Sequence, residues 1–364
     1  MTDTRFKQQA AQERPSTIRE PSLDEKVAFL SKPEAYALGA GDVVRRETHM
    51  SWVFLAGDKA YKLKKPVRLP YLDFSTLARR EAACRAELKL NRRLAQGIYL
   101  DVVPLRLAGA MSIGGDGHIV DWLVVMRRLD ETGSLEQAIR RSRIRHQEID
   151  SFAGLLVAFY RHAARARVSA PDHLVAWRQS LADNRHVLLK PELGLPAYRV
   201  RRIDRVQRRF LDCCPKALLD RVHHIVDGHG DLRPEHIWLN NPGPIIDCIE
   251  FNARLRSVDP FDEVAYLSVE CERLGARWIG ERVKRHLIRA LHDPIPEDLF
   301  TFYRCYRASL RARLSIAHLL GPNPRTPEKW PAQALTYLDI AERNAIVLER
   351  TFSSQAARPR IRSR

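Results

Sequence analysis

The segment Asp227–Asn252 reads DGHGDLRPEHIWLNNPGPIIDCIEFN and gathers several potential proton carriers and metal ligands in a stretch that is otherwise strand and turn. These residues are His229, Asp231, Glu235, His236, Asp247 and Glu250. A carboxylate that orients and deprotonates a hydroxyl, beside ligands for a divalent cation, is what metal-dependent phosphoryl transfer needs. This segment therefore decides both the fold class and the chemistry that we expect.

The Asn-Asn-Pro-Gly-Pro run in the middle of this segment predicts a turn between two strands, Ile237–Leu239 and Ile245–Ile249. A turn centred on Pro242 sets His236 opposite Cys248 and next to Asp247. Opposed Cβ atoms lie about 5 Å apart in such a ladder. The pattern predicts that two metal ligands meet at one end of a hairpin, with the loop carboxylate just upstream.

The first half of the chain carries the pattern of a small sheet with one helix. Ser51–Leu55 and Ala60–Lys64 flank Ala-Gly-Asp-Lys and predict a hairpin. A helix is expected from an N-cap at Ser75 to about Ala95. Leu100–Leu107 and Ile119–Met126 then predict two more strands. The order is strand, strand, helix, strand, strand.

Most of the second half has helical periodicity. The expected helical stretches are Ser134–Ala163, Pro171–Leu189, Ala197–Cys213, Asp259–Leu274 and Leu299–Leu320. Since 364 residues at roughly 150 per domain indicate two domains or lobes, a sheet-containing part followed by a mainly helical part is expected.

Composition excludes several classes of protein. No apolar run approaches the roughly 18 residues of a membrane span, and the N-terminus lacks the apolar core of a signal peptide, which favours a cytoplasmic location. The six cysteines include no C-x-x-C pair, so neither a zinc knuckle nor a disulfide framework is indicated. The formal net charge of +17 fits a phosphorylated ligand or an acidic partner.

The chemistry-bearing motifs resemble those of one family. His229–His236, HGDLRPEH, resembles the H-G-D-x-x-x-x-N catalytic loop of the aminoglycoside phosphotransferase and choline kinase group, which has the protein-kinase-like fold. Ile245-Ile246-Asp247 resembles the metal motif of that group. Asp259–Ala265, DPFDEVA, resembles the segment that supports the loop. The resemblance implies an ATP- and Mg²⁺-dependent phosphotransferase that acts on a small-molecule hydroxyl, with Asp231 as the base.

The resemblance also divides the chain. It implies an α/β (α+β) two-lobe fold, with a small antiparallel-sheet N-lobe at 25–128 that binds the nucleotide. The mainly helical C-lobe at 129–345 then holds the catalytic loop, the metal and the acceptor. Residues 1–24 and 346–364 are expected to be tails. His229 is expected to hold the catalytic loop through a hydrogen bond rather than to transfer protons.

The remaining site residues follow from the same resemblance. Lys62, in Ala-Tyr-Lys, is expected on the α and β phosphates, with Lys64 as the alternative. Glu87 lies in the apolar arc of the expected helix, where a carboxylate needs a buried cation, so it is expected to pair with Lys62. The strand end that includes Met126, Arg127 and Leu129 is expected to receive the adenine.

Two departures from the family pattern bear on the site. No G-x-G-x-x-G covers the phosphates, so Ser51 or its backbone is expected to serve there. His236 replaces the usual Asn, and an imidazole suits Mn²⁺ or Zn²⁺ better than Mg²⁺. Either one metal is lost or Glu250 helps to hold it. The same substitution also fits a degenerate kinase that binds nucleotide without turnover.

Two other functions use the same residues or the same charge. The cluster of histidines and aspartates at 223–236 fits a metal-dependent hydrolase, although His223 and His224 lie on a run typical of an edge strand, where neighbours face opposite ways. A nucleic-acid-binding module fits +17, but the sequence has no RNP, zinc-finger or helix-turn-helix signature. A specific nucleic acid is therefore not expected as a partner.

An arginine stripe bears on the acceptor. Arg304, Arg307 and Arg311 follow one another at i, i+3 and i+7 on the last predicted helix. A charged stripe of this kind is typically a solvated face. If it lines the cleft instead, it favours an acidic or phosphorylated acceptor, since Arg forks match those groups. Either way a cationic aminoglycoside gains no attraction, so resistance to these antibiotics is not expected.

Overall fold

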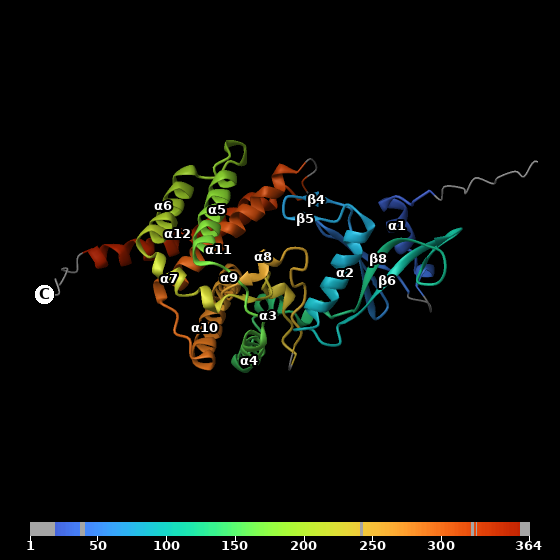
Figure 1. The fold of residues 1–364 in the computed structure, drawn as a ribbon, viewed down its shortest axis with the longest axis horizontal. Helices are drawn as coiled ribbons and strands as arrows, with labels where there is room; N and C mark the ends of the chain where they lie inside the picture. The colour runs from blue at the N-terminus through green and yellow to red at the C-terminus, as the bar shows by residue number, and fades with distance from the viewer. Residues whose placement is uncertain (1–18, 37–40, 241–242, 322–323, 325, 357–364) are drawn as a thin grey trace, which may run out of the picture.

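The structure, a computed structural model, describes residues 19–36, 41–240, 243–321, 324 and 326–356 and arranges them in two lobes (Figure 1). The N-lobe is built on a six-stranded antiparallel sheet with the strand order β1-β2-β3-β8-β6-β7. Its strands are β1 Val44–Glu47, β2 Ser51–Ala56, β3 Lys59–Lys64, β6 Tyr99–Ala108, β7 Ala110–Ile113 and β8 His118–Arg127. Two short ladders lie outside this sheet. One pairs β4 Arg68–Leu69 with β5 Leu72–Asp73, and the other, in the C-lobe, pairs β9 Val226–Asp227 with β10 Ser257–Val258.

Each face of the N-lobe sheet is covered by one helix, α1 Leu23–Leu30 or α2 Leu77–Asn91. Side chains alternate along a strand, so successive residues of β8 join different cores. Leu123 packs in the core that contains Leu30 of α1, whereas Val124 packs with Cys84 of α2. Because Val124 is opposed to Lys62 in the ladder, the Lys62 side chain lies on the α2 face of the sheet.

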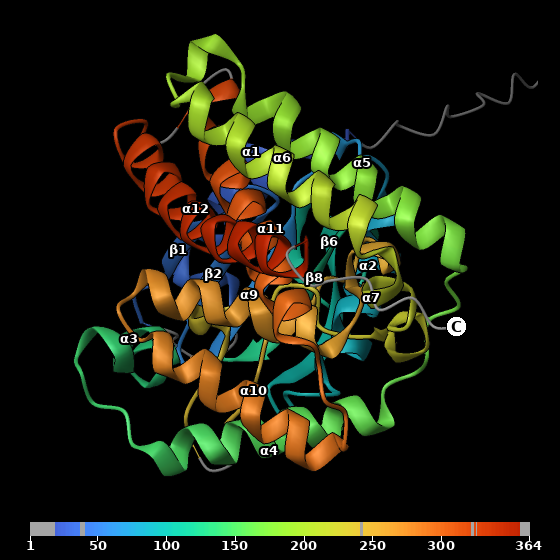
Figure 2. The same ribbon diagram turned by 90° about the vertical axis from the view of Figure 1, so that its left-hand side faces the viewer.

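The C-lobe is helical and shares one large core. Its helices are α3 Leu135–Arg140, α4 His146–His162, α5 Ala170–Leu188, α6 Ala197–Cys213, α7 Pro215–Leu219, α8 Ala253–Arg256, α9 Pro260–Arg273, α10 Arg277–Leu291, α11 Glu297–Ile316 and α12 Lys329–Ala356. Helix α9 lies at the centre and is buried from Pro260 to Cys271. Figure 2 shows α5 and α6 on one side of the central helices and α4 and α10 on the other.

Three helix boundaries in the structure differ from those predicted from the sequence. Helix α1 begins at Leu23, inside the predicted tail, because Ser22 forms a capping box with Glu25. Helix α2 is capped by Thr76 rather than by Ser75. Helix α12 continues past residue 345 to Ala356 and buries Phe352, so the lobe extends further than predicted. Residues 1–18 and 357–364 of the predicted tails lie outside the described residues.

Two further observations concern cysteines and membranes. All six cysteines are free, and Cys84, Cys248, Cys271 and Cys305 are buried. Within the described ranges, no helix is both long enough and apolar enough to cross a bilayer.

Candidate active site

Buried hydrogen bonds hold the loop His229–His236 in place. His229 is fully buried, and its Nε2 lies 2.9 Å from the Ile246 carbonyl oxygen. Its Nδ1 accepts from the Asp231 N–H at 3.3 Å, and burial lowers the pKa of its imidazole. Glu263 of α9 accepts the His229 N–H at 3.0 Å. His229 thus shapes the loop, as predicted, and the supporting carboxylate is Glu263.

Two donors orient the carboxylate of Asp231. The Tyr266 hydroxyl donates to Oδ1 at 3.0 Å, and Arg233 Nε donates to Oδ2 at 3.1 Å. Burial raises the pKa of Asp231, but Arg233, His236 and Arg311 together bring it below the usual range. Asp231 is therefore an ionised acceptor with a fixed direction. The sequence analysis did not identify Tyr266 or Arg233, although Arg233 lies inside the motif.

Hydrogen bonds to side chains of the N-lobe position the backbone at Asp247. Its φ of 62° is in the left-handed region, where Asp is among the few non-glycine residues found. Its N–H donates to the Tyr99 hydroxyl at 3.1 Å, and the next N–H, of Cys248, donates to Asn91 Oδ1 at 2.9 Å. Burial raises the pKa of Asp247, but Lys62 and His236 hold it well below the usual range.

Asp231, His236 and Asp247 form the group of potential metal ligands that the described residues contain, with ligand atoms within 4.8 Å of one another. His236 Nδ1 lies 3.0 Å from the Asp231 carbonyl oxygen, and its Nε2 lies 3.6 Å from Asp247 Oδ2. A proton on Nδ1, donated to that carbonyl, leaves Nε2 as an acceptor, and Arg233 Nη2 lies 3.2 Å from it. A metal on Nε2 would therefore have to displace this arginine. Two carboxylates and one imidazole fit a divalent cation.

The predicted register of this segment is wrong by two residues. Ile237 bridges Ile245, and the Ile246 N–H donates to the His236 carbonyl at 2.9 Å, so His236 is opposite Ile246 and not Cys248. The two predicted strands are joined by this isolated bridge, and Asn241 and Pro242 of the predicted turn lie outside the described residues. His236 and Asp247 nevertheless meet, as predicted.

A chain of buried ion pairs joins the lobes beside Asp247. Lys62 Nζ lies 2.8 Å from both Glu87 Oε1 and Asp247 Oδ1, which confirms the predicted Lys62–Glu87 contact. Lys64 Nζ lies 2.6 Å from Glu87 Oε2 and 2.5 Å from Glu250 Oε1. Burial lowers the pKa of Lys62, but its two carboxylate partners raise it well above the usual value. Both lysines are charged.

The predicted metal role of Glu250 is not supported. Its carboxylate bonds to Lys64 and is absent from the group that Asp231, His236 and Asp247 form in the described part of the chain. Burial raises the pKa of Glu250, although Lys64 opposes this. A carboxylate held by a buried ammonium serves the ion-pair chain rather than a metal.

The remaining predicted nucleotide contacts lie on N-lobe strands. Ser51 is 2% exposed, and its N–H donates to Thr48 Oγ1 at 2.9 Å. Its backbone N–H is therefore already used within the turn that precedes β2. Met126 and Arg127 end β8, and Leu129 follows in the connection to the C-lobe. The Arg127 N–H donates to the Ile98 carbonyl at 2.8 Å. Their roles toward phosphate and adenine stay predictions.

The arginine stripe is not a solvated face. Arg304, Arg307 and Arg311 are buried or nearly so and pair with carboxylates of α9. Arg307 forms two hydrogen bonds to Asp262, at 2.7 and 2.6 Å. Arg311 Nε lies 2.5 Å from Glu270 Oε1. These arginines therefore neutralise the carboxylates of α9, the helix that supports the loop His229–His236.

The histidines of the alternative hydrolase site do not assemble. His223 and His224 lie in a 3₁₀ turn, Val222–His224, and not on an edge strand. His224 Nδ1 lies 2.9 Å from Asp293, and Asp227 pairs with Arg256. The metal group of the described chain contains none of these side chains. The geometry does not support the hydrolase.

Sequence comparisons give relatives without an assigned activity. No model of a known protein family matches the chain. Uncharacterized proteins of Mycobacterium bovis and Mycobacterium tuberculosis are 33% identical over 304 residues, a match that covers 81% of this chain and 58% of each relative. The chain thus spans about three fifths of the length of the curated relatives it matches.

Comparisons with solved structures identify the fold. A choline/ethanolamine kinase family protein from Mesorhizobium loti matches with a TM-score of 0.50 and 18% identity, over 90% of this chain and 99% of that one. An aminoglycoside 2′-phosphotransferase-IIIa in complex with GDP gives 0.52 and 14%, over 88% and 98%. A hygromycin B complex of APH(4)-Ia with AMP-PNP gives 0.50 and 12%, over 87% and 97%. These likenesses confirm the predicted architecture.

Proposed function

We infer that this chain transfers the γ-phosphoryl group of ATP to a hydroxyl of a small molecule. The inference starts from its protein-kinase-like fold, which it shares with the aminoglycoside phosphotransferase and choline kinase structures. The observation that carries this proposal is the meeting of Asp231, His236 and Asp247 within 4.8 Å, beside Lys62. These are the base, the metal ligands and the phosphate cation that such a transfer needs.

Each side chain has a defined task in this proposal. Asp231, ionised and directed by Tyr266 and Arg233, accepts the hydroxyl proton as the acceptor oxygen bonds to phosphorus and the bond to the leaving ADP breaks. Lys62 neutralises phosphate oxygens and is itself held by Glu87. Asp247 and His236 would hold a divalent cation, Mg²⁺ or Mn²⁺, which would supply charge neutralisation at the phosphates.

A phosphorylation screen tests this function directly. The protein is incubated with γ-labelled ATP, Mg²⁺ or Mn²⁺, and pooled small hydroxyl compounds, and labelled products are measured. Asp231→Asn is expected to lower kcat by about 10²- to 10⁴-fold, since it removes the proton acceptor. The thermal shift caused by ATP should persist in this variant. Asp220→Asn, an exposed carboxylate on another surface, is the control and should leave transfer unchanged.

The same measurements separate the alternatives. An ATP-induced thermal shift without any labelled product would make the chain a nucleotide-binding protein without turnover, which the histidine at position 236 permits. Equal loss of transfer and of nucleotide binding in Asp231→Asn would show that Asp231 holds the loop rather than serving as the base.

A further inference from the structure

The α5–α6 helix pair of the C-lobe (Figure 1) carries a basic groove. We call this the α5–α6 groove. It consists of two adjoining hollows, of about 500 and 540 Å³, that share Arg185 and Arg208. Its cationic lining is Arg185, Lys190, Arg201, Arg205, Arg208 and Arg209.

Helix geometry brings these cations to one face. Arg201, Arg205 and Arg208 follow one another at i, i+4 and i+7, so they lie along one side of α6. The opposite side of α6 buries Ile203 and Phe210 in the core. Because one face of α6 packs in the core, the arginines on its other face point toward solvent and line the groove.

The carboxylates of the groove do not balance this charge. Asp204 is already shared by Arg185 at 2.8 Å and Arg208 at 2.9 Å. Asp212 pairs with Arg178, which lies outside the lining. Arg201 and Arg205 are exposed and have no carboxylate partner in the part of the chain that the structure describes. The groove keeps an excess of positive charge.

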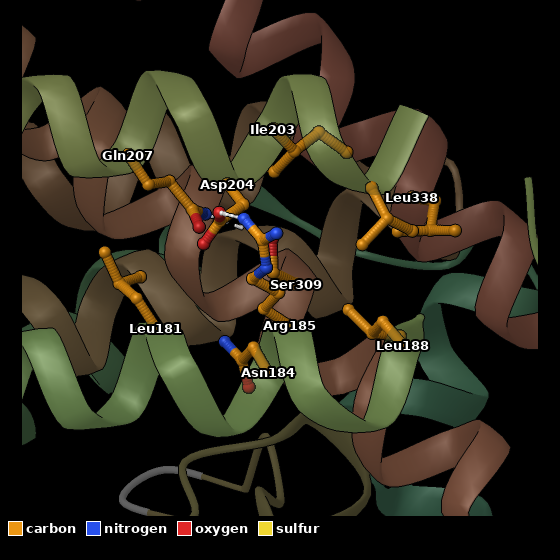
Figure 3. A pocket seen from close by; sticks show the side chains of 10 residues that line it. Leu181, Asn184, Arg185, Leu188, Ile203, Asp204, Gln207, Ser309 and Leu338 are labelled. Atoms are coloured by element: carbon orange, nitrogen blue, oxygen red, sulfur yellow. Dashed lines mark hydrogen bonds and ion pairs between the residues drawn. The ribbon is translucent and has the colours of Figure 1, made fainter. Parts of the chain in front are cut away.

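The inner end of the groove holds a polar group without a partner. Arg185 and Asp204 also line a small cavity of about 10 Å³ between α5, α6 and α11, together with Asn184 (Figure 3). Asn184 is 3% exposed, and within the described residues neither its Oδ1 nor its Nδ2 has a hydrogen-bond partner. An unpaired buried amide costs about 1–3 kcal/mol, and a cavity of about 10 Å³ has room for one water molecule at most.

We propose that the α5–α6 groove binds a small molecule that carries two or more phosphate groups. Arginine forks match phosphate oxygens with two parallel hydrogen bonds, and three or more arginines reach into one hollow. The volume is within the range of small-molecule sites, and Leu189 and Pro191 give the organic part of such a ligand an apolar wall. Both hollows are open to solvent, so a nucleic-acid strand is the occupant that the experiment below must distinguish from a small anion.

Binding of inorganic tripolyphosphate, measured by calorimetry without divalent cations, tests the proposal. The double variant Arg201→Glu/Arg205→Glu should lose at least about tenfold in affinity, since it removes two charge-assisted contacts and adds repulsion. Arg285→Glu/Arg289→Glu is the matched control, because these exposed arginines have the same spacing on α10, on the opposite side of the C-lobe (Figure 2). It makes the same change in net charge and should bind as the wild type does.

Two results would overturn the proposal. Equal affinity in the groove variant and the control would place tripolyphosphate elsewhere, for example at Lys62. A single-stranded oligonucleotide that binds more tightly than tripolyphosphate, with an affinity that grows with its length, would assign the groove to nucleic acid. ADP and inositol hexakisphosphate serve as further probes, and loss of binding of either one in the groove variant alone supports the site. The result does not depend on phosphotransfer, which the Asp231→Asn experiment tests separately.

Discussion

The ammonium of Lys64 and the carboxylate of Glu250 form an ion pair across the two lobes, with Nζ 2.5 Å from Oε1. The Lys64 side chain is 1% exposed and that of Glu250 is 8% exposed. Lys62 makes the parallel contact to Asp247, three residues earlier in the same segment. Glu87 accepts from both lysines, so Lys62 and Lys64 are each shared between α2 and the segment from Asp247 to Glu250.

Replacing Lys64 by Met should strongly destabilise the fold. Glu87 and Glu250 would keep their buried charges with one cation fewer, and breaking a buried pair in this way costs about 3–5 kcal/mol. The free energy of unfolding, from urea titration, measures the loss. Lys59→Met, at an exposed position of the same strand, is the control and should change stability by no more than about 0.5 kcal/mol.

The pairing itself is tested by adding Glu250→Leu to the Lys64 variant. The double variant should lose less stability than the two single variants together, because the partner left unpaired in each is then removed. Strict additivity would contradict a direct Lys64–Glu250 interaction.

Stability should fall in mildly acidic solution because of His229. Burial lowers the pKa of this imidazole in the folded chain, whereas the unfolded chain titrates near the usual value of about 6.5. The unfolded state therefore binds an extra proton as the pH drops below that value, and stability declines by at most about 1.4 kcal/mol per pH unit. Urea unfolding at pH 7, 6 and 5 should show a shallower decline for His229→Gln. An identical decline would mean that His229 titrates normally in the fold.

Metal preference should depend on His236. The imidazole Nε2 beside Asp247 favours Mn²⁺ over Mg²⁺, whereas an amide oxygen at the same position suits Mg²⁺. His236→Asn is expected to weaken Mn²⁺ binding and to strengthen Mg²⁺ binding, each measured by calorimetry in the presence of ATP. Unchanged affinities for both cations would remove His236 from the ligand set.

Removing the Asn184 amide should stabilise the protein. Asn184→Leu keeps a similar volume and eliminates a buried polar group without a partner among the described residues, a gain of about 1–3 kcal/mol. Asn344→Leu is the control: this buried Asn donates to the Ile340 carbonyl at 2.7 Å, so its loss should destabilise. Destabilisation by Asn184→Leu in thermal melts would show that a water pairs the amide.

The protein should not confer resistance to aminoglycosides. A polycationic ligand needs unpaired carboxylates, but Asp262 and Glu270 of α9 are already paired with Arg307 and Arg311. Overexpression in a sensitive host, against a panel of these antibiotics, checks this expectation. A clear rise in the inhibitory concentration of any one of them would contradict it.

The contacts that sequence reasoning predicted depend on local periodicity. Glu87 lies on the apolar arc of its helix and so faces the sheet and Lys62. His236 and Asp247 meet although the predicted register is wrong by two residues. His236 is opposite Ile246, so a regular strand would place Asp247 on the other face, and the left-handed φ of 62° takes Asp247 out of that pattern.

The features that sequence reasoning missed depend on partners far away in the chain. The stripe of Arg304, Arg307 and Arg311 has the spacing of a solvated face, and its burial depends on carboxylates of α9, at least 32 positions earlier for each pair. Glu250 looks like a metal ligand until Lys64, 186 positions away, is placed beside it. The sequence prediction also lacks helices α10 and α12, although the buried Ile279, Val283 and Leu287 of α10 recur at the spacing of one helix face.

Under the proposed function, the cross-lobe contacts of Lys62 and Lys64 also determine how a nucleotide would enter. Parting the lobes would strip buried ammonium groups of their carboxylates, which is a costly motion. The turn between β1 and β2, by contrast, meets the C-lobe through His49 and His318, whose ring centroids lie 6.1 Å apart. Lifting this turn is therefore the cheaper route to Lys62, and the amide hydrogens of the edge strand β1 should exchange with solvent well before those of β3.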